Sequence, residues 1–213
     1  AQSMGYGMSQ TLPPKFSDFM IAHVAAEVAQ KTEQTMFQGV NANVGEFDGY
    51  EVLLAADNTV VDVAAVGGGI DAANVIAELG KVVDAIPAAL YGKEDLFIYV
   101  PSSAAKFYVQ ALGGFAAAGL GANGVNNMGT QWWNNGSLTV NGVKLFVCPG
   151  LANDKMIAAQ RSNLFFGTGL LNNMNEVKII DMQDIDGSQN VRFVMRYTAG
   201  VQIGIGSDVV FYA

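Results

Sequence analysis

The sequence has a single cysteine and a single histidine, and this scarcity limits its chemistry. Because Cys148 stands alone among 213 residues, a disulfide within the chain and a zinc site built from cysteines are excluded. A Ser-His-Asp triad would have to use His23, and no Gly-x-Ser-x-Gly motif supplies a nucleophile. We assign no catalytic residue, metal ligand or cofactor, and predict that the protein is not an enzyme.

Charge is also scarce. Charged residues make up 14% of the chain, whereas a soluble domain usually carries about a quarter. The deficit predicts that other subunits cover much of the surface. The net charge of −8 argues against a protein that coats itself on nucleic acid, because such binding requires phosphate neutralisation. No secretory signal is visible. The charge-free stretch between Lys106 and Lys144 is interrupted by glycine and asparagine, so we do not interpret it as membrane-spanning.

Three helices are predicted from apolar spacing and end signals. A long helix follows Pro13-Pro14 over about residues 15–38, and Gly39 ends it in the C′ position. A second follows the capping residue Asp71 over about 72–86. Its buried face comprises Val75, Ile76, Leu79, Val82, Val83 and Ile86. A third, short helix starts at Pro101-Ser102-Ser103 and ends at Gly113-Gly114.

Strands are predicted mainly late in the chain, which favours an α+β fold. The clearest signal is Asn141-Gly142 between residues 137–140 and 143–148, a type I′ hairpin turn. Further strands are expected at 50–54, 60–66, 96–100 and 209–212, with a long hairpin formed by 177–182 and 191–197. Residues 1–12 are interpreted as a mobile arm. The loop 113–136 is long enough to have a task of its own.

Each remaining motif has a structural interpretation that we favour over a functional one. Gly67-Gly68-Gly69 is a flexible turn rather than a phosphate site, because no Gly-Lys-Ser/Thr follows it. Asp181, Asp184 and Asp186 form a polar hairpin turn, with a loose cation site as the lesser alternative. Cys148 is expected to be buried and inert. Trp132-Trp133 is expected to pack or to contact another subunit.

The order of elements resembles the major capsid proteins of tailed bacteriophages, the fold first seen in Hong Kong phage 97. The long helix 15–38 resembles the spine helix of that family. Helix 72–86, strand 96–100 and helix 103–112 resemble the passage from its peripheral to its axial domain. The hairpin 138–148 before Pro149-Gly150, and the Asn163-to-Leu170 loop that leads into the last strands, resemble its closing segments.

The resemblance implies an α+β fold with a spine helix, a peripheral domain bearing a long β-hairpin, and an axial domain with a mixed sheet flanked by helices. Residues 13–70 and 171–213 would form the peripheral domain, 71–170 the axial domain, and 1–12 an arm remnant. The family carries an N-terminal arm and an extended loop before the spine helix. Only twelve residues precede it here, so we expect a processed or trimmed chain.

The implied function is a structural virion protein whose pentamers and hexamers form an icosahedral shell around double-stranded DNA. It would bind that DNA without sequence specificity and contact portal, scaffold or decoration proteins, but no membrane. It would reside in the virion capsid after synthesis in the host cytoplasm. The alternatives are a secreted β-rich binding or adhesin module and a small hydrolase or nucleotide-binding domain. Candidate subunit contacts are Phe16, His23, Trp132, Trp133, Asp184 and Asp186.

Overall fold

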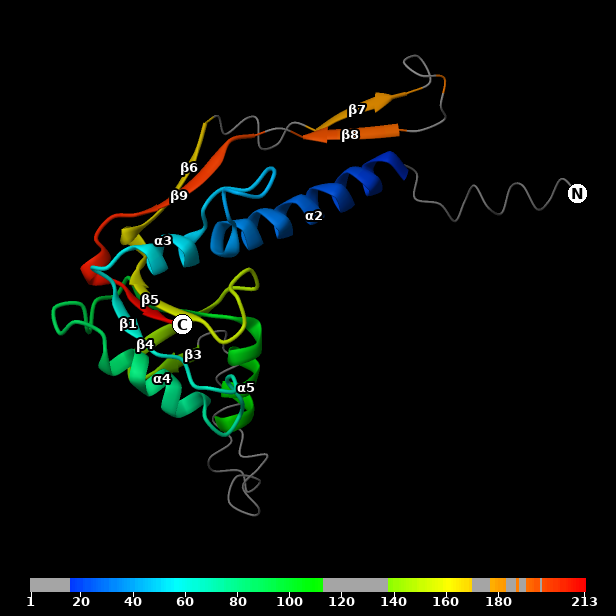
Figure 1. Ribbon diagram of the computed structural model, residues 1–213. Helices are drawn as coiled ribbons and strands as arrows, with labels where there is room; N and C mark the ends of the chain where they lie inside the picture. The colour runs from blue at the N-terminus through cyan, green and yellow to red at the C-terminus, as the bar shows by residue number, and fades with distance from the viewer. Residues whose placement is uncertain (1–15, 113–137, 170–176, 183–186, 188–190, 196) are drawn as a thin grey trace, which may run out of the picture. The chain divides into compact units, whose positions relative to one another are not determined.

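The computed structural model describes residues 16–112, 138–169, 177–182, 187, 191–195 and 197–213. The chain divides into two compact units (Figure 1). Unit 1 comprises residues 1–32 and 168–199, and unit 2 comprises residues 33–167 and 200–213. The domain boundaries expected at residues 70 and 171 stay predictions. In the present division, residues 33–70 and the last strand of the chain belong to the unit that holds the central sheet.

Unit 2 is built on one mixed six-stranded sheet. In spatial order its strands are β1 (Val61–Val63), β10 (Val210–Tyr212), β5 (Met156–Gln160), β2 (Leu96–Val100), β4 (Val143–Val147) and β3 (Leu138–Val140). The pairs β1–β10 and β2–β4 are parallel, and the other neighbouring pairs are antiparallel. The central strands β5 and β2 are rich in buried apolar residues, as expected of strands covered on both faces.

Helices cover the two faces of this sheet unequally. On the first face lie α4 (Val75–Asp84) and α5 (Ser102–Leu112), and on the second lie α3 (Tyr50–Ala56) and the last turns of α2 (Phe16–Gln38) (Figure 1). Strand alternation divides the side chains between them: Met156 faces α4 and α5, whereas the next residue, Ile157, packs with α3. A mixed sheet flanked by helices, as the resemblance implied, is therefore confirmed.

The first face holds the larger hydrophobic core. Its fully buried side chains from α4, β2, β5 and β10 include Val75, Leu79, Val82, Ile98, Met156 and Tyr212. The second face holds a smaller core, in which the Phe37 and Tyr50 rings meet at 5.7 Å. Gln38 at the end of α2 donates a 2.7 Å hydrogen bond to the Gly150 carbonyl. The end of the long helix is thereby attached to the sheet of its own unit.

Unit 1 contains the first part of α2 and a two-stranded antiparallel hairpin. The hairpin pairs β7 (Val177–Asp181) with β8 (Val191–Met195), as the sequence predicted. Within this unit the Thr32 hydroxyl donates to the Val28 carbonyl at 2.7 Å and also shares a hydrogen bond with the Tyr197 hydroxyl. A second two-stranded sheet pairs β6 (Leu164–Thr168) with β9 (Ala199–Ile203), most of whose residues belong to unit 2.

Several sequence predictions are confirmed closely. Helix α2 ends at Gln38, strand β2 occupies residues 96–100, and β3 and β4 flank Asn141-Gly142. Both turn residues have positive φ angles, 46° and 81°, as a type I′ turn requires. Gly39 is needed for a different reason from the one predicted. It is not among the residues with positive φ, but a Cβ there would lie 2.3 Å from the Phe47 carbonyl oxygen.

Four predictions were wrong. Residues 50–54 form helix α3 rather than a strand, because they pack Tyr50 and Leu54 against the sheet at helical spacing. Helix α4 begins at Val75, since Asp71 closes the preceding turn by accepting hydrogen bonds from the Ala73 and Asn74 amides. Ile76 is 48% exposed rather than buried. Residues 164–168 form strand β6 rather than a loop.

Candidate assembly surfaces

An aromatic patch lies on the second face of the sheet, over β2 and β4. The rings of Phe97, Tyr99 and Phe146 lie within 5.7 to 6.4 Å of one another. Phe146 is 53% exposed, and the Lys144 ammonium lies 6.0 Å from the Phe97 ring centroid. We call these four residues the aromatic patch. It combines one exposed ring, that of Phe146, and two more deeply packed rings with one positive charge, which is a combination common at protein interfaces.

Strand register explains why these side chains share one surface. The Asn141-Gly142 turn fixes the pairing of β3 with β4, so Val143 and Leu145 point into the first-face core. Lys144 and Phe146 must then point to the opposite face. Parallel pairing places Lys144 beside Phe97 and Phe146 beside Tyr99. Sequence reasoning missed this patch, although the hairpin turn and the alternation of β4 contained the signal for it.

A second exposed surface is the loop 40–48 that follows α2. Its tip residue, Val44, is fully exposed (104%). The loop is held by its own side chains: Asp48 accepts a 2.8 Å hydrogen bond from the Asn41 amide, and Glu46 accepts a 3.0 Å bond from the Asn43 side chain. Val44 is thus an apolar residue presented on a loop with two nearby carboxylates.

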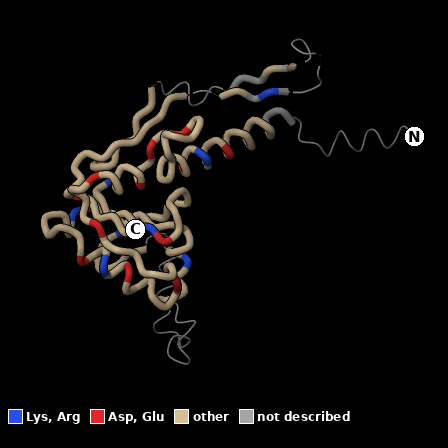
Figure 2. The backbone as a smooth tube through the Cα atoms, viewed as in Figure 1, with Lys and Arg blue, Asp and Glu red and all other residues tan. Residues whose placement is uncertain are grey.

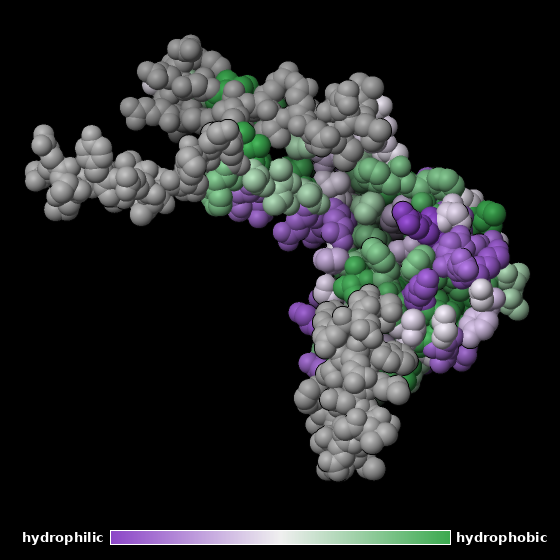
Figure 3. All heavy atoms as spheres, turned by 180° about the vertical axis from the view of Figure 1, so that it is seen from behind, coloured by the Kyte–Doolittle hydropathy of each residue, from purple (hydrophilic) through white to green (hydrophobic). Residues whose placement is uncertain are grey.

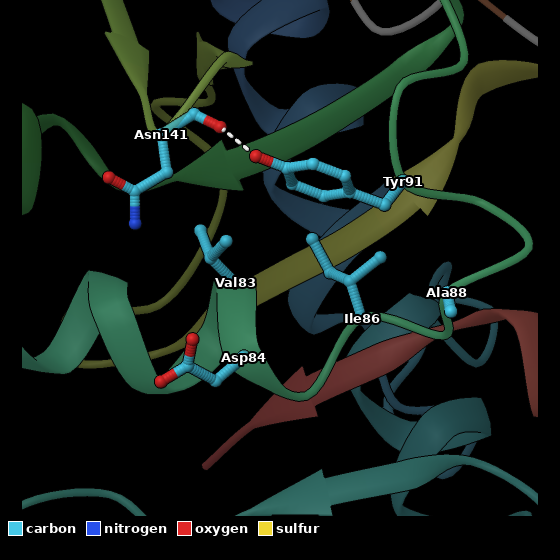
Figure 4. A pocket seen from close by; sticks show the side chains of 6 residues that line it. All are labelled: Val83, Asp84, Ile86, Ala88, Tyr91 and Asn141. Atoms are coloured by element: carbon cyan, nitrogen blue, oxygen red, sulfur yellow. Dashed lines mark hydrogen bonds between the residues drawn. The ribbon is translucent and has the colours of Figure 1, made fainter.

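An open groove of about 630 Å³ lies between the end of α4 and the β3–β4 turn. Val83, Ile86, Ala88 and Tyr91 line it, and Asp84 contributes a negative charge. Figure 4 shows the Tyr91 ring extending toward Asn141, whose carbonyl accepts a 2.6 Å hydrogen bond from the Tyr91 hydroxyl. Val83 and Ile86 are themselves largely buried, so the groove offers little apolar surface beyond the ring of Tyr91.

The β6–β9 sheet carries two more exposed aromatic side chains, Phe165 (53%) and Phe166 (42%). Figure 2 shows both strands without a charged residue. The base of the sheet is anchored by Asn163, whose side-chain amide donates to the Ile205 carbonyl and accepts from the Ile205 amide, both at 2.8 Å. Figure 3 shows hydrophobic areas between hydrophilic ones on the surface of unit 2.

Two buried carboxylates stabilise the framework that presents these surfaces. Glu51 on α3 accepts 2.9 Å contacts from the Ala152 amide and the Lys155 ammonium. Glu78 on α4 accepts 2.8 Å hydrogen bonds from Lys81 and from the Tyr212 hydroxyl. Burial raises the pKa of Glu78, but hydrogen bonds from Lys81 and Tyr212 and the Lys81 charge outweigh it and hold that pKa below its ordinary value.

The structure describes only part of the predicted contact set. Phe16 is the first residue of α2, but its side chain lies outside the described residues. His23 is exposed on α2 and stacks on Phe19, with ring centroids 6.4 Å apart. Trp132, Trp133, Asp184 and Asp186 lie outside the described residues, as do the loop 113–136 and most of the turn 184–188. These six contacts stay predictions.

Two motifs have the structural roles expected of them. Cys148 is buried, as predicted, and burial raises the pKa of its thiol to about 12. At Gly67-Gly68-Gly69 the chain turns, and the following Ile70 amide donates a 2.7 Å hydrogen bond to the Asp154 carboxylate. Within the described residues, no cluster of three or more His, Cys, Asp or Glu could hold a metal ion, and no helix is long and apolar enough to cross a membrane.

Several solved structures of phage and GTA particles contain chains similar to this one. A chain in a structure of Mycobacterium phage Che8 matches with a TM-score of 0.54 and 14% identity, over 88% of this chain and 60% of that one. A chain from the capsid of an empty GTA particle matches with a TM-score of 0.58 and 12% identity, over 92% and 65%. A chain of the satellite phage P4 procapsid matches with a TM-score of 0.56 and 9% identity, over 99% and 71%.

These matches define the class of fold. The chain has the α+β fold found in chains of phage and GTA particles, which confirms, for the fold, the resemblance to phage capsid proteins. It spans 60 to 71% of the length of those three chains. No protein-family model matches the sequence, and no curated protein matches it. The similarity to these chains is therefore visible in the three-dimensional structure, whereas the sequence alone matches no family model and no curated protein.

Proposed function

We propose that this chain is a structural shell protein, the major capsid protein of a tailed bacteriophage, and has no catalytic role. One observation carries the proposal: the fold matches phage and GTA particle chains over 88 to 99% of its length. The low charged fraction of 14% supports it, because surfaces hidden between copies need few charges to stay in solution.

In this proposal many copies pack side by side into pentamers and hexamers, and these tile an icosahedral shell. The exposed aromatic residues of β4 and β6 would be covered by neighbouring copies. Each contact can be weak on its own, because a closed shell engages many identical contacts at once. Residues 71–170 would form the axial domain, with the loop 113–136 near a ring axis, while 13–70 and 171–213 would form the peripheral domain.

The shell would enclose double-stranded DNA without sequence-specific contacts. In unit 2 the acidic residues outnumber the basic ones by 13 to 6, whereas unit 1 has 6 acidic and 5 basic residues. An excess of negative charge reduces adhesion to packaged DNA. The protein would lie in the virion capsid after synthesis in the host cytoplasm, and portal, scaffold or decoration proteins are its expected further partners.

Negative-stain electron microscopy of the purified chain tests the proposal, with light scattering to measure mass. Rings or closed shells of uniform size are expected above a threshold concentration, since assembly from many weak contacts is cooperative. Compact monomers at every concentration, on a grid where a known shell-forming protein assembles, would refute it. Enclosure of DNA is tested by assembling the particles in the presence of DNA and then adding nuclease. Enclosure predicts that the DNA present during assembly is protected from digestion.

A further inference from the structure

Two surfaces of unit 2 complement each other in residue type and charge. The loop 40–48 presents a fully exposed Val44 close to the carboxylates of Glu46 and Asp48. The aromatic patch presents the Phe146 ring beside the Lys144 ammonium. An aliphatic side chain can pack on the aromatic rings while opposite charges face each other at the rim of the contact.

We propose that the loop 40–48 of one copy docks on the aromatic patch of a second copy, with Val44 against Phe146 and Glu46 facing Lys144. The inference rests on the proposed function and names one contact through which the shell would form. Val44 is fully exposed, so no described part of its own chain covers it. Both surfaces belong to unit 2, and their exposure in the same unit leaves them available to another molecule.

The loop is preorganised for docking. Its end at Gly39 is fixed by two backbone hydrogen bonds, from the Gly39 amide to Thr35 at 2.8 Å and from the Gly49 amide to Gly39 at 2.9 Å. The Asp48 and Glu46 side chains hold the turns between these points. A loop already ordered in the free protein loses little conformational entropy on binding, which favours association.

Charge selects the aromatic patch over the groove beside Tyr91. Docking in that groove would bring the acidic loop toward Asp84, and like charges across an interface disfavour binding. The patch instead offers Lys144. Phe146 and Tyr91 are equally exposed, at 53%, so the sign of the neighbouring charge is what separates the patch from the groove.

The symmetry of this contact fits the growth of a shell. The loop and the patch are different surfaces, so each copy uses its loop on one neighbour and its patch on another. Such heterologous contacts form rings or extended lattices and do not stop at a dimer. A single loop on a single patch buries much less than the roughly 1,000 Å² expected of a stable pairwise interface, so the contact requires repetition to persist.

Disulfide trapping tests the pairing. The double variant Val44→Cys with Phe146→Cys is assembled above its own threshold concentration and then oxidised mildly. It is expected to give a ladder of dimers, trimers and larger species on a non-reducing gel. Native Cys148 does not interfere, because it is buried and its thiol pKa is raised to about 12. The matched control pairs Val44→Cys with Ile76→Cys, an exposed position on α4, and should stay monomeric.

A ladder that ends at dimers, a ladder of equal strength in the control, or monomers alone would each overturn the pairing. The wild-type chain separates this result from the proposed function. If the wild type forms particles but the double variant gives no specific ladder, only the pairing of loop and patch is overturned. A wild-type chain that forms neither rings nor shells would overturn the proposed function, and the pairing with it.

Charge exchange supplies a second test that introduces no cysteine. Glu46→Lys and Lys144→Glu should each raise the threshold concentration for assembly by about threefold to tenfold. The two together should recover the part of the loss that is due to charge, while the loop hydrogen bonds of Glu46 stay lost. The control is Asp62→Lys, which makes the same charge change as Glu46→Lys. Asp62 lies on β1, at the edge of the sheet away from the aromatic patch, so this variant should leave the threshold unchanged. No recovery in the double variant, with all variants folded, would overturn the pairing.

Discussion

The two faces of the central sheet differ in how completely the chain covers them. The first face is closed by α4 and α5, and its side chains form one continuous core. The second face is closed by α3 and the end of α2 over β5 and β10, but Phe146 on β4 is half exposed. The same sheet therefore provides folding stability on one side and, over β2 and β4, a surface for other molecules. The predictions below test this division of roles.

The largest effect is expected in the first-face core. Leu79→Ala removes a side chain that is 1% exposed and should lower the free energy of unfolding by about 2–5 kcal/mol, because a cavity is left beneath α4. Ile76→Ala on the same helix, at a 48% exposed position, should cost only about 0.5 kcal/mol. Urea denaturation followed by circular dichroism measures both. Equal losses would show that α4 is not held by this core.

The next effect concerns the covered part of the second face. Glu51→Ala should cost about 1–3 kcal/mol, because the Ala152 amide and the Lys155 ammonium both lose their acceptor. Glu51→Gln, which keeps an oxygen for the Ala152 amide, should cost less. Thermal unfolding of the wild type and the two variants, measured side by side, ranks their stabilities. If Gln destabilises as much as Ala, the ion pair rather than the amide contact holds α3 on the sheet.

A smaller, pH-dependent effect is expected from Glu78 on the first face. Its pKa in the folded protein lies below the ordinary value of 4.5, so the ionised form is favoured by folding. That contribution is fully present above the unfolded pKa and is lost as pH falls through the lowered folded value. Glu78→Gln should therefore flatten the loss of stability in acid. Urea midpoints between about pH 3 and pH 7 test this, and parallel curves for variant and wild type would contradict it.

Local signals in the sequence predicted the elements that local interactions determine. The Asn141-Gly142 turn, the strand 96–100 and the end of α2 at Gly39 were all found from neighbouring residues. Residues 50–54 were assigned as a strand because a short apolar run does not distinguish strand from helix. Only the packing of Tyr50 and Leu54 on the sheet made them a helix.

The surfaces were harder to predict than the elements, because a surface combines strands distant in sequence. Phe97 and Phe146 share a face only through the parallel pairing of β2 with β4. Strand β5 was not predicted at all, although it is central in the sheet. Its short run Met156-Ile157-Ala158-Ala159 lies between turns, and its strand character depends on the partners β10 and β2. Pairing of this kind is decided by tertiary structure.

The smallest effect on stability, and the one that most directly tests the comparison, is expected at the aromatic patch. Phe146→Ser should change the free energy of unfolding of the unassembled protein by about 1 kcal/mol or less, since the ring is already half in water. It should nevertheless weaken assembly, because the hydroxymethyl group cannot replace the ring in a contact with a neighbour. Phe165→Ser on β6 removes an equally exposed ring, 53% in both cases, and is the matched comparison for the stability of the unassembled protein. If Phe146→Ser destabilised the monomer as strongly as Leu79→Ala, the second face would be core across its whole width, and the distinction between a face for folding and a face for contact would fail.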